Sequence, residues 1–237
     1  MPFMFNGKVP EAVTYNGNDA QIVKCNGVVV WEKNKKLRQL AVGSVVYLME
    51  DNYTPYIIIA HGHHGGGLTT LLRQNVNKYC RFHFDVPTDE YYNKYDESTL
   101  KTEMGKLFSN LPAETQRCIE TVYIPVRNSA QDSTSISIPV NFFPLSGYEL
   151  NGSGSAGEGT QIQYFKSDAL RVATDGTTAL VYWTRSVVPG MHNFARCVDV
   201  RGELGNYTVN VNIHMRPACC VASDFVVTET DGKYYVI

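Results

Sequence analysis

The chain has 237 residues, of which 43% are hydrophobic, so it can bury one large core or a core with a small appendage. Its 21 basic and 23 acidic residues give a formal net charge of −2, which removes the bulk electrostatic argument for nucleic-acid binding. No apolar run approaches the ~20 residues of a membrane helix, so we expect no membrane insertion. The first residues lack the charged and apolar parts of a signal peptide, which predicts synthesis and folding in a cytosol.

The N-terminal segment is punctuated by Asn-Gly pairs at positions 6, 16 and 26. Asn-Gly favours the tight turn of a β-hairpin, because both turn residues need positive φ. Residues 1–33 therefore predict a small all-β module, too small to bury much surface alone. We expect it to pack on the main domain, on a partner chain or on a larger particle; an ordinary N-terminal sheet of the same domain is the alternative. The basic stretch Lys33–Arg38 is interpreted as a solvated linker.

Residues 41–237 are predicted to form the second, larger domain. Apolar or alternating runs bounded by turn residues predict strands at Ala41–Leu48, Tyr56–Ala60, Leu68–Arg73, Thr121–Val126, Phe225–Thr228 and Tyr234–Ile237. Apolar residues at helical spacing predict one helix at Asp96–Ser109, and a second begins at Pro112 and runs to about Glu120.

The cysteines lack the C-x-x-C spacing of metal or redox motifs. They are Cys25, Cys80, Cys118, Cys197, Cys219 and Cys220. We expect free, mostly buried thiols, with the adjacent pair in a core strand.

Histidines and acids offer two weak metal hypotheses. His61, His63 and His64 share one glycine-rich loop, but no further Cys, His or acid at metal-binding spacing completes a zinc site. We therefore predict an exposed loop and no metal, with a metal site as the alternative. Surface acids are expected near the tyrosines, and a structural calcium ion is their alternative; these acids are Asp85, Asp89, Glu90, Asp96 and Glu97. No nucleophile set or phosphate loop is found, so the chain is not predicted to be an enzyme.

Short motifs in a shared order carry a family resemblance. The pattern W-x-R-S occurs at Trp183–Ser186 and M-R-P-A at Met215–Ala218. Further pieces are Val42–Val46, Leu71–Arg73, Tyr95–Ser98, Ile124–Arg127 and Phe143–Glu149. From about Val42 to Val221 the chain resembles the DUF6273 family of bacterial and prophage proteins. That family usually has Trp-Trp-Leu-Arg-Ser, where this chain has Tyr182-Trp183-Thr184-Arg185-Ser186.

The resemblance implies an α+β fold, namely a C-type-lectin-like domain that is β- and loop-rich and has two helices. In it Trp183, Arg185, Arg216 and Pro217 are expected to be scaffold, with Tyr182 and Trp183 in the core and Arg185 paired with a carboxylate. The segment between the two arginines mixes aromatic, amide, cationic and flexible apolar groups, as recognition surfaces do. The predicted ligand-binding residues are Val187, Met191, His192, Asn193, Phe194, Arg201, Glu203, Asn206 and Tyr207.

The expected function is that of a non-enzymatic phage or prophage virion protein, made in the host bacterial cytoplasm, that binds a host surface glycan or protein. Residues 1–33 would contact other virion proteins, since such Asn-Gly segments resemble those of phage structural proteins. A homo-oligomer, a trimer by analogy with phage fibres, is expected. Related folds include receptor binders diversified by retroelements, here over Val187–Asn212. One alternative is a structural head-fibre, tail or decoration protein without a receptor. Another is an oxidase of the formylglycine-generating type, which uses a cysteine pair and copper and would involve Cys197.

Overall fold

The computed structural model describes residues 14–15, 18–19, 22–25, 28–32, 34–83, 93–128, 130–152 and 157–236. Its helices are α1 (Thr99–Ser109), α2 (Ala113–Cys118) and α3 (Gly147–Asn151), with 3-10 turns η1 (Leu37–Gln39) and η2 (Asp168–Leu170). The strands of the first part are β1 (Thr14–Tyr15), β2 (Asn18–Asp19), β3 (Ile22–Cys25), β4 (Val28–Glu32), β5 (Asn34–Lys36), β6 (Val45–Met49), β7 (Tyr53–His61), β8 (Leu68–Arg73), β9 (Tyr79–Cys80), β10 (Ile119–Glu120), β11 (Val122–Arg127) and β12 (Ser135–Val140). The second part contains β13 (Ala173–Thr174), β14 (Ala179–Leu180), β15 (Tyr182–Val188), β16 (Met191–Val198), β17 (Leu204–Thr208), β18 (Ile213–His214), β19 (Ala218–Ala222), β20 (Val226–Thr230) and β21 (Lys233–Val236).

Two hairpins precede the main sheets, as the Asn-Gly pairs predict. β1 pairs antiparallel with β2 across positions 16–17, and β3 pairs with β4 across positions 26–27. The Asn-Gly pairs themselves, including the one at 6–7, lie outside the described residues. The predicted solvated linker is wrong in part, because β5 pairs with β20 and the Leu37 side chain of η1 is fully buried.

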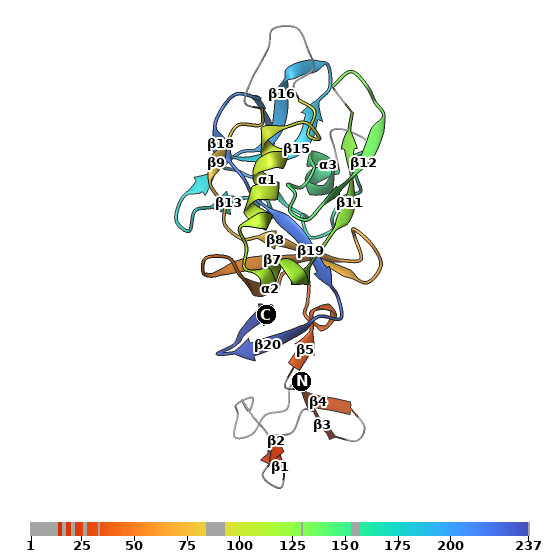
Figure 1. The fold of residues 1–237 in the computed structure, drawn as a ribbon, viewed down its shortest axis with the longest axis vertical. Coiled ribbons are helices and arrows are strands. Elements are labelled where there is room, and N and C mark those ends of the chain that lie inside the picture. Colours follow the sequence, from red (N-terminus) through yellow and green to blue (C-terminus); the bar gives the residue numbers. More distant parts are fainter. Residues whose placement is uncertain are drawn as a thin grey trace.

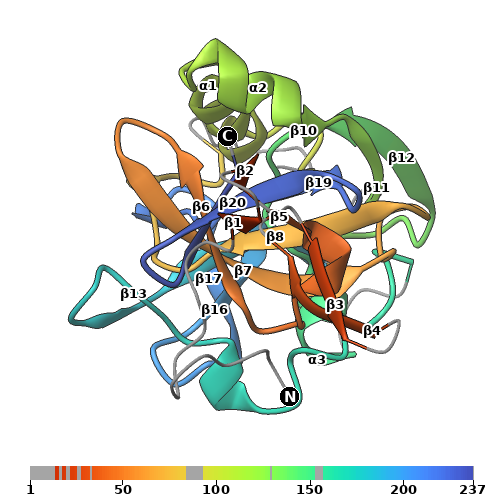
Figure 2. The same cartoon turned by 90° about the horizontal axis from the view of Figure 1, so that it is seen from below.

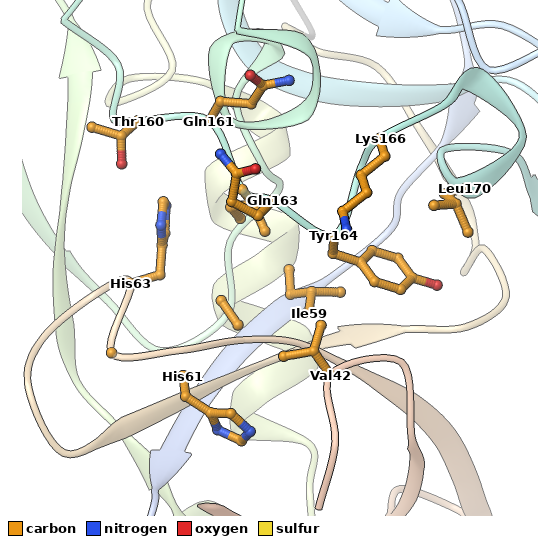
Figure 3. A pocket seen from close by; sticks show the side chains of 13 residues that line it. Val42, Ile59, His61, His63, Thr160, Gln161, Gln163, Tyr164, Lys166 and Leu170 are labelled. Atoms are coloured by element: carbon orange, nitrogen blue, oxygen red, sulfur yellow. The ribbon is translucent and has the colours of Figure 1, made fainter.

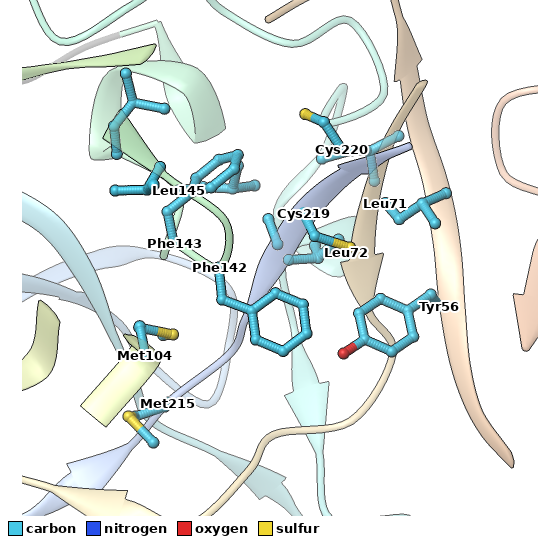
Figure 4. Close-up of a cluster of buried hydrophobic side chains, with 14 of the residues drawn as sticks. Tyr56, Leu71, Leu72, Met104, Phe142, Phe143, Leu145, Met215, Cys219 and Cys220 are labelled. Atoms are coloured by element: carbon cyan, nitrogen blue, oxygen red, sulfur yellow. The ribbon is translucent and has the colours of Figure 1, made fainter. Parts of the chain in front are cut away.

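An eight-stranded sheet, in the order β10-β19-β8-β7-β6-β21-β20-β5, forms the centre of the molecule (Figure 1). The predicted strand pair and its third strand are confirmed as the antiparallel meander β6-β7-β8. The predicted terminal hairpin is confirmed as β20-β21, and β21 runs parallel to β6. Cys219 and Cys220 lie in the buried strand β19, as expected, among Tyr56, Leu72 and Phe142 (Figure 4).

A second sheet, in the order β17-β16-β15-β18-β9, carries the W-x-R-S motif on β15. All seven residues of β15 are buried, because this strand lies inside the sheet and packs against neighbouring elements on both faces. The indole N–H of Trp183 donates to the carbonyl of Cys80 at 3.0 Å, and its ring packs edge-on against Phe82. The expected core role of Tyr182 and Trp183 is therefore confirmed.

Both predicted helices are present, and they lie together on one side of the main sheet (Figure 2). Ser98 caps α1 by accepting from the backbone N–H of Lys101 at 3.0 Å, and Leu100 and Met104 face the core. The third helix, α3, was not predicted. It begins with a capping box, in which Ser146 and Glu149 bond reciprocally to each other's backbone N–H.

The predicted α+β, C-type-lectin-like class is wrong. The described residues are mostly in β-sheets, and the three helices have only 11, 6 and 5 residues. Several strands are two residues long and form only by pairing with distant segments, as β9 does with β18. Local sequence patterns do not reveal such strands, which is why the sequence understates the β content. No helix in the described part has the length and apolar character needed to cross a membrane.

Candidate functional site

A fully buried ion pair joins Arg185 of β15 to Glu149 of α3. Two guanidinium nitrogens donate to the two carboxylate oxygens at 2.6 and 2.7 Å. The guanidinium also donates to the carbonyls of Pro125, Pro144 and Glu158 at 3.0–3.2 Å. Burial alone would raise the pKa of Glu149, but the charge and hydrogen bonds of Arg185 outweigh it and hold that pKa well below its ordinary value. The expected carboxylate partner of Arg185 is therefore confirmed, and this arginine joins three segments as scaffold.

Arg216, the arginine of the second motif, is buried in a similar way. It donates to the backbone carbonyls of Arg73, Arg171 and Gln74 at 3.0–3.2 Å, and its guanidinium lies over the Tyr182 ring at 5.3 Å. Because the guanidinium donors of Arg185 and Arg216 bond to groups inside the fold, neither motif arginine offers its charge to a ligand.

A second buried carboxyl group, Glu158, lies beside the Arg185 pair. It accepts a short hydrogen bond from the Ser186 hydroxyl, and this hydroxyl in turn accepts from the backbone N–H of Gly147 at 2.8 Å. Burial raises the pKa of Glu158 to about 7, although the Ser186 hydrogen bond and the charge of Arg185 act in the opposite direction. This group is therefore half-protonated near neutral pH.

The loop after β7 brings two histidines to the same buried carboxylate. His61 and the glycines of the loop are exposed as predicted, but the His63 and His64 side chains turn inward and are only 11% and 4% exposed. Their Nε2 atoms lie 3.6 and 3.8 Å from Oε1 of Glu149. Burial lowers the pKa of His64 to about 4, so its imidazole is neutral at ordinary pH. These three residues could hold a metal ion, since their ligand atoms all lie within 4.8 Å of one another.

An open cavity of about 780 Å³ gives solvent a route to this cluster. His63 stands at its edge beneath Thr160, and Gln161, Gln163 and Lys166 supply polar groups along the wall (Figure 3). The floor is apolar and comes from Val42, Ile59 and Tyr164. A small polar ligand entering here would meet the His63 imidazole first.

The sequence did not predict that Glu149, Glu158 and Ser186 belong to this cluster. One local signal was present, because Ser146-Gly147-Tyr148-Glu149 has the S-x-x-E spacing of a capping box and predicts a helix start. This spacing predicts the start of α3, but it does not indicate that the distant histidines lie near Glu149.

The predicted ligand-binding residues divide into four groups. Asn193 of β16 and Tyr207 of β17 share one sheet face, because Tyr207 is paired with Ala195 and side chains alternate along the paired strands; Met191 begins β16 at the same end of the hairpin, where its pairing with β15 is irregular. By the same alternation Phe194 and Asn206 lie on the opposite face, and His192 lies in the irregular part of β16. Arg201 and Glu203 form an ion pair of 3.0 Å in the β16–β17 turn, at the far end of the hairpin from Met191. Val187 is fully buried and presents no side chain to solvent.

The side chains of Met191, Asn193 and Tyr207 are exposed. Met191 is 49% and Tyr207 is 42% exposed, and Asn193 is exposed as well. Further along β16, Ala195 and Cys197 are fully buried, so the hairpin that carries these three side chains is anchored in the core. We call these three residues the β16–β17 patch.

The thiols and acids named in the sequence have ordinary structural surroundings. The five cysteines at positions 80, 118, 197, 219 and 220 are free and buried, as predicted, and burial raises the pKa of Cys197 to about 12. A thiol with so high a pKa stays protonated near neutral pH and is a poor nucleophile. This weighs against the hypothesis of an oxidase that uses Cys197. Asp96 and Glu97 pair with Lys101 and Lys94, while Asp85, Asp89 and Glu90 lie outside the described residues.

Comparisons with known proteins give one match. The profile of a family described as a domain of unknown function, DUF6273, matches residues 66–223. This range contains both arginine motifs, α3 and the β16–β17 patch, whereas the motif at Val42–Val46 lies outside it. No curated protein and no solved structure matches the chain significantly. The match covers most of the chain, which therefore belongs to the DUF6273 family.

Proposed function

We propose that this protein is a non-catalytic binding protein of a phage or prophage particle, and that its β16–β17 patch holds a glycan on the host surface. The observation that carries this proposal is the exposure of an aromatic ring, an amide and a thioether at one end of a hairpin that is anchored in the core. An exposed tyrosine face can stack on a sugar ring, and a neighbouring amide can donate to and accept from its hydroxyl groups.

The surroundings of the patch support binding over catalysis. Two charged groups of the first motif and α3, Arg185 and Glu149, are buried and paired with each other. The patch itself holds no acid, base or thiol. Attachment to a particle would use the Asn-Gly hairpins, whose strands β1 to β4 pair only with each other among the described residues.

The test is a cell-binding assay with the purified, fluorescently labelled full chain on a panel of candidate host bacteria. The cells are used untreated, after periodate oxidation of their sugars, and after protease digestion of their surface proteins. The proposal predicts saturable binding that periodate removes and protease leaves intact.

Two other outcomes would contradict it. Binding that only protease removes would indicate a protein receptor in place of a glycan. No binding of the folded chain to any host would contradict receptor binding and favour a purely structural role in the particle.

A further inference from the structure

His63, His64 and Glu149 are brought together from two distant parts of the chain, and we propose that they bind a divalent transition-metal ion of the zinc class. This site is separate from the β16–β17 patch, and it does not depend on the function proposed for that patch. It would connect the loop between β7 and β8 to helix α3.

The distances between the histidine nitrogens and the Glu149 carboxylate suit coordination of a shared ion better than direct hydrogen bonds. The two Nε2–Oε1 separations of 3.6 and 3.8 Å exceed the 2.7–3.2 Å of an N–H···O bond. Ligand atoms that share a tetrahedral zinc ion with bonds of ~2.0–2.2 Å lie roughly 3.3–3.5 Å apart. The two histidine–carboxylate separations therefore need to close by only a few tenths of an ångström around an ion, and all three ligand atoms lie within 4.8 Å of one another.

An unsatisfied buried atom gives independent support. Nε2 of His64 is buried and has no hydrogen-bond partner, although it points toward the carboxylate. A buried polar atom without a partner is unfavourable, and a metal bond would satisfy it. The His64 ring is also held in place, because it packs edge-on against Phe143 at a centroid distance of 4.9 Å.

The surrounding groups orient the carboxylate as metal sites usually require. Glu149 accepts from Arg185 on both oxygens and from the backbone N–H of Ser146 at 2.9 Å, so the carboxylate cannot rotate. The buried Glu158 beside Arg185 adds negative charge when ionised, which offsets part of the charge of an added cation.

The loop that carries the histidines can make the small closing movement. Gly62, Gly65 and Gly67 have φ values of 78°, 140° and 87°, and an added Cβ on Gly62 or Gly67 would meet nothing within 4 Å. His63 lines the open cavity, so one of the three ligands can be reached from solvent (Figure 3).

The ligand set selects the class of ion. Two imidazole nitrogens and one carboxylate suit zinc and its neighbours in the transition series, whereas calcium and magnesium prefer a shell of oxygen atoms. Three protein ligands with one open position are the arrangement in which zinc keeps an exchangeable water.

The experiment uses the tag-free full chain after treatment with a chelator. Zinc, nickel or magnesium chloride is added, while the melting temperature is recorded and the zinc stoichiometry is measured by competition with a coloured chelator. We expect one zinc ion per chain and a melting temperature that rises with zinc or nickel but not with magnesium, because an ion that binds the native state stabilises it.

Histidine variants assign the site. His63→Gln and His64→Gln keep a polar side chain but remove a ligand, and each should weaken zinc affinity at least about 10-fold. His61→Gln is the matched control. His61 lies close to the other two histidines in sequence, but its ring nitrogens bond to the Thr69 hydroxyl and the Leu40 carbonyl. The zinc affinity of this variant should be unchanged. Glu149 is not substituted, because its loss would leave the buried Arg185 without its carboxylate partner.

The proposal is overturned if the folded wild-type chain binds no zinc, if magnesium stabilises it equally, or if His63→Gln and His64→Gln bind zinc as tightly as the wild type. Equal loss of zinc affinity in His61→Gln would also contradict the proposal, because the loss would then come from a general disturbance of the loop and not from removal of a metal ligand.

Discussion

At the residue scale, Arg185 connects most of the elements around the candidate sites. One guanidinium bonds to α3 through Glu149, to β11 through Pro125 and to the loops at Pro144 and Glu158. The pairing of this arginine with a carboxylate was predicted from the sequence, but the identity of the partner was not. The reason is physical, because an arginine that is buried in a strand must find its counter-charge somewhere, and local sequence does not say where.

Arg185→Met is expected to lower the free energy of unfolding by about 3–5 kcal/mol, since it leaves the Glu149 carboxylate buried without its partner. Urea denaturation of the two proteins measures the loss. Arg201→Met serves as control, because Arg201 is an exposed arginine in surface ion pairs and should change the free energy by no more than about 0.5 kcal/mol. Equal effects of the two substitutions would show that Arg185 is not a structural centre.

Glu158 predicts a pH dependence of stability. Its pKa is raised from 4.5 to about 7 in the folded chain, so between these pH values the native state holds a proton that the unfolded state releases. The free energy of unfolding should therefore fall as pH rises from about 5 to 8, by an amount on the order of 3 kcal/mol from this group.

Glu158→Gln removes this titration and retains an oxygen that accepts from Ser186. The variant should gain stability relative to the wild type as pH rises through this window. Denaturant titrations of both proteins at several pH values, with a chelator present, measure the difference. A difference that stays constant with pH would contradict the assigned proton.

At the scale of elements, the β16–β17 turn is held against η2 by a close backbone contact. Gly202 has a φ of 86°, and its carbonyl accepts from Nε of Arg171 at 2.8 Å. A Cβ at this position would lie 1.9 Å from the Asp168 carbonyl oxygen, a distance no packing adjustment of a side chain relieves. The turn is therefore held by its own left-handed conformation at Gly202 and by its contact with η2. It closes the hairpin that carries the β16–β17 patch.

Gly202→Ala should lower the free energy of unfolding by roughly 2–5 kcal/mol, from the left-handed conformation and the backbone collision together. Gly232→Ala is the control, because Gly232 has a similar φ of 73° but open space around its Cβ position. It should cost only about 1–2 kcal/mol. Thermal or urea denaturation separates the two, and equal costs would exclude the contact with η2 as the cause.

At the scale of the whole molecule, the sequence predicts elements much better than it predicts their arrangement. The meander β6-β7-β8, the terminal hairpin and α1 follow from local patterns of apolar and turn residues, which act within a few positions. The short strands β9 and β18 exist only because distant segments pair, so the mostly β class was missed. The same limit applies to the candidate metal site, since nothing near His63 and His64 in sequence indicates Glu149.

The β16–β17 patch was predicted in part for the same reason. The sequence places all nine candidate residues in one segment, and the strand pairing then separates them by face and by end of the hairpin. Asn193 and Tyr207 remain on one exposed face, with Met191 exposed at the same end of the hairpin. A binding account of this protein therefore depends on these three residues, and not on the segment as a whole.

The most direct test of that account compares two tyrosine variants in the cell-binding assay. Tyr207→Ala, combined with Asn193→Ala, removes the ring and amide of the β16–β17 patch. Tyr123→Ala removes a tyrosine that is 68% exposed on β11, elsewhere on the surface. The account predicts that the first variant loses host binding with an unchanged melting temperature, whereas Tyr123→Ala binds as the wild type does. Undiminished binding by the folded patch variant would contradict it.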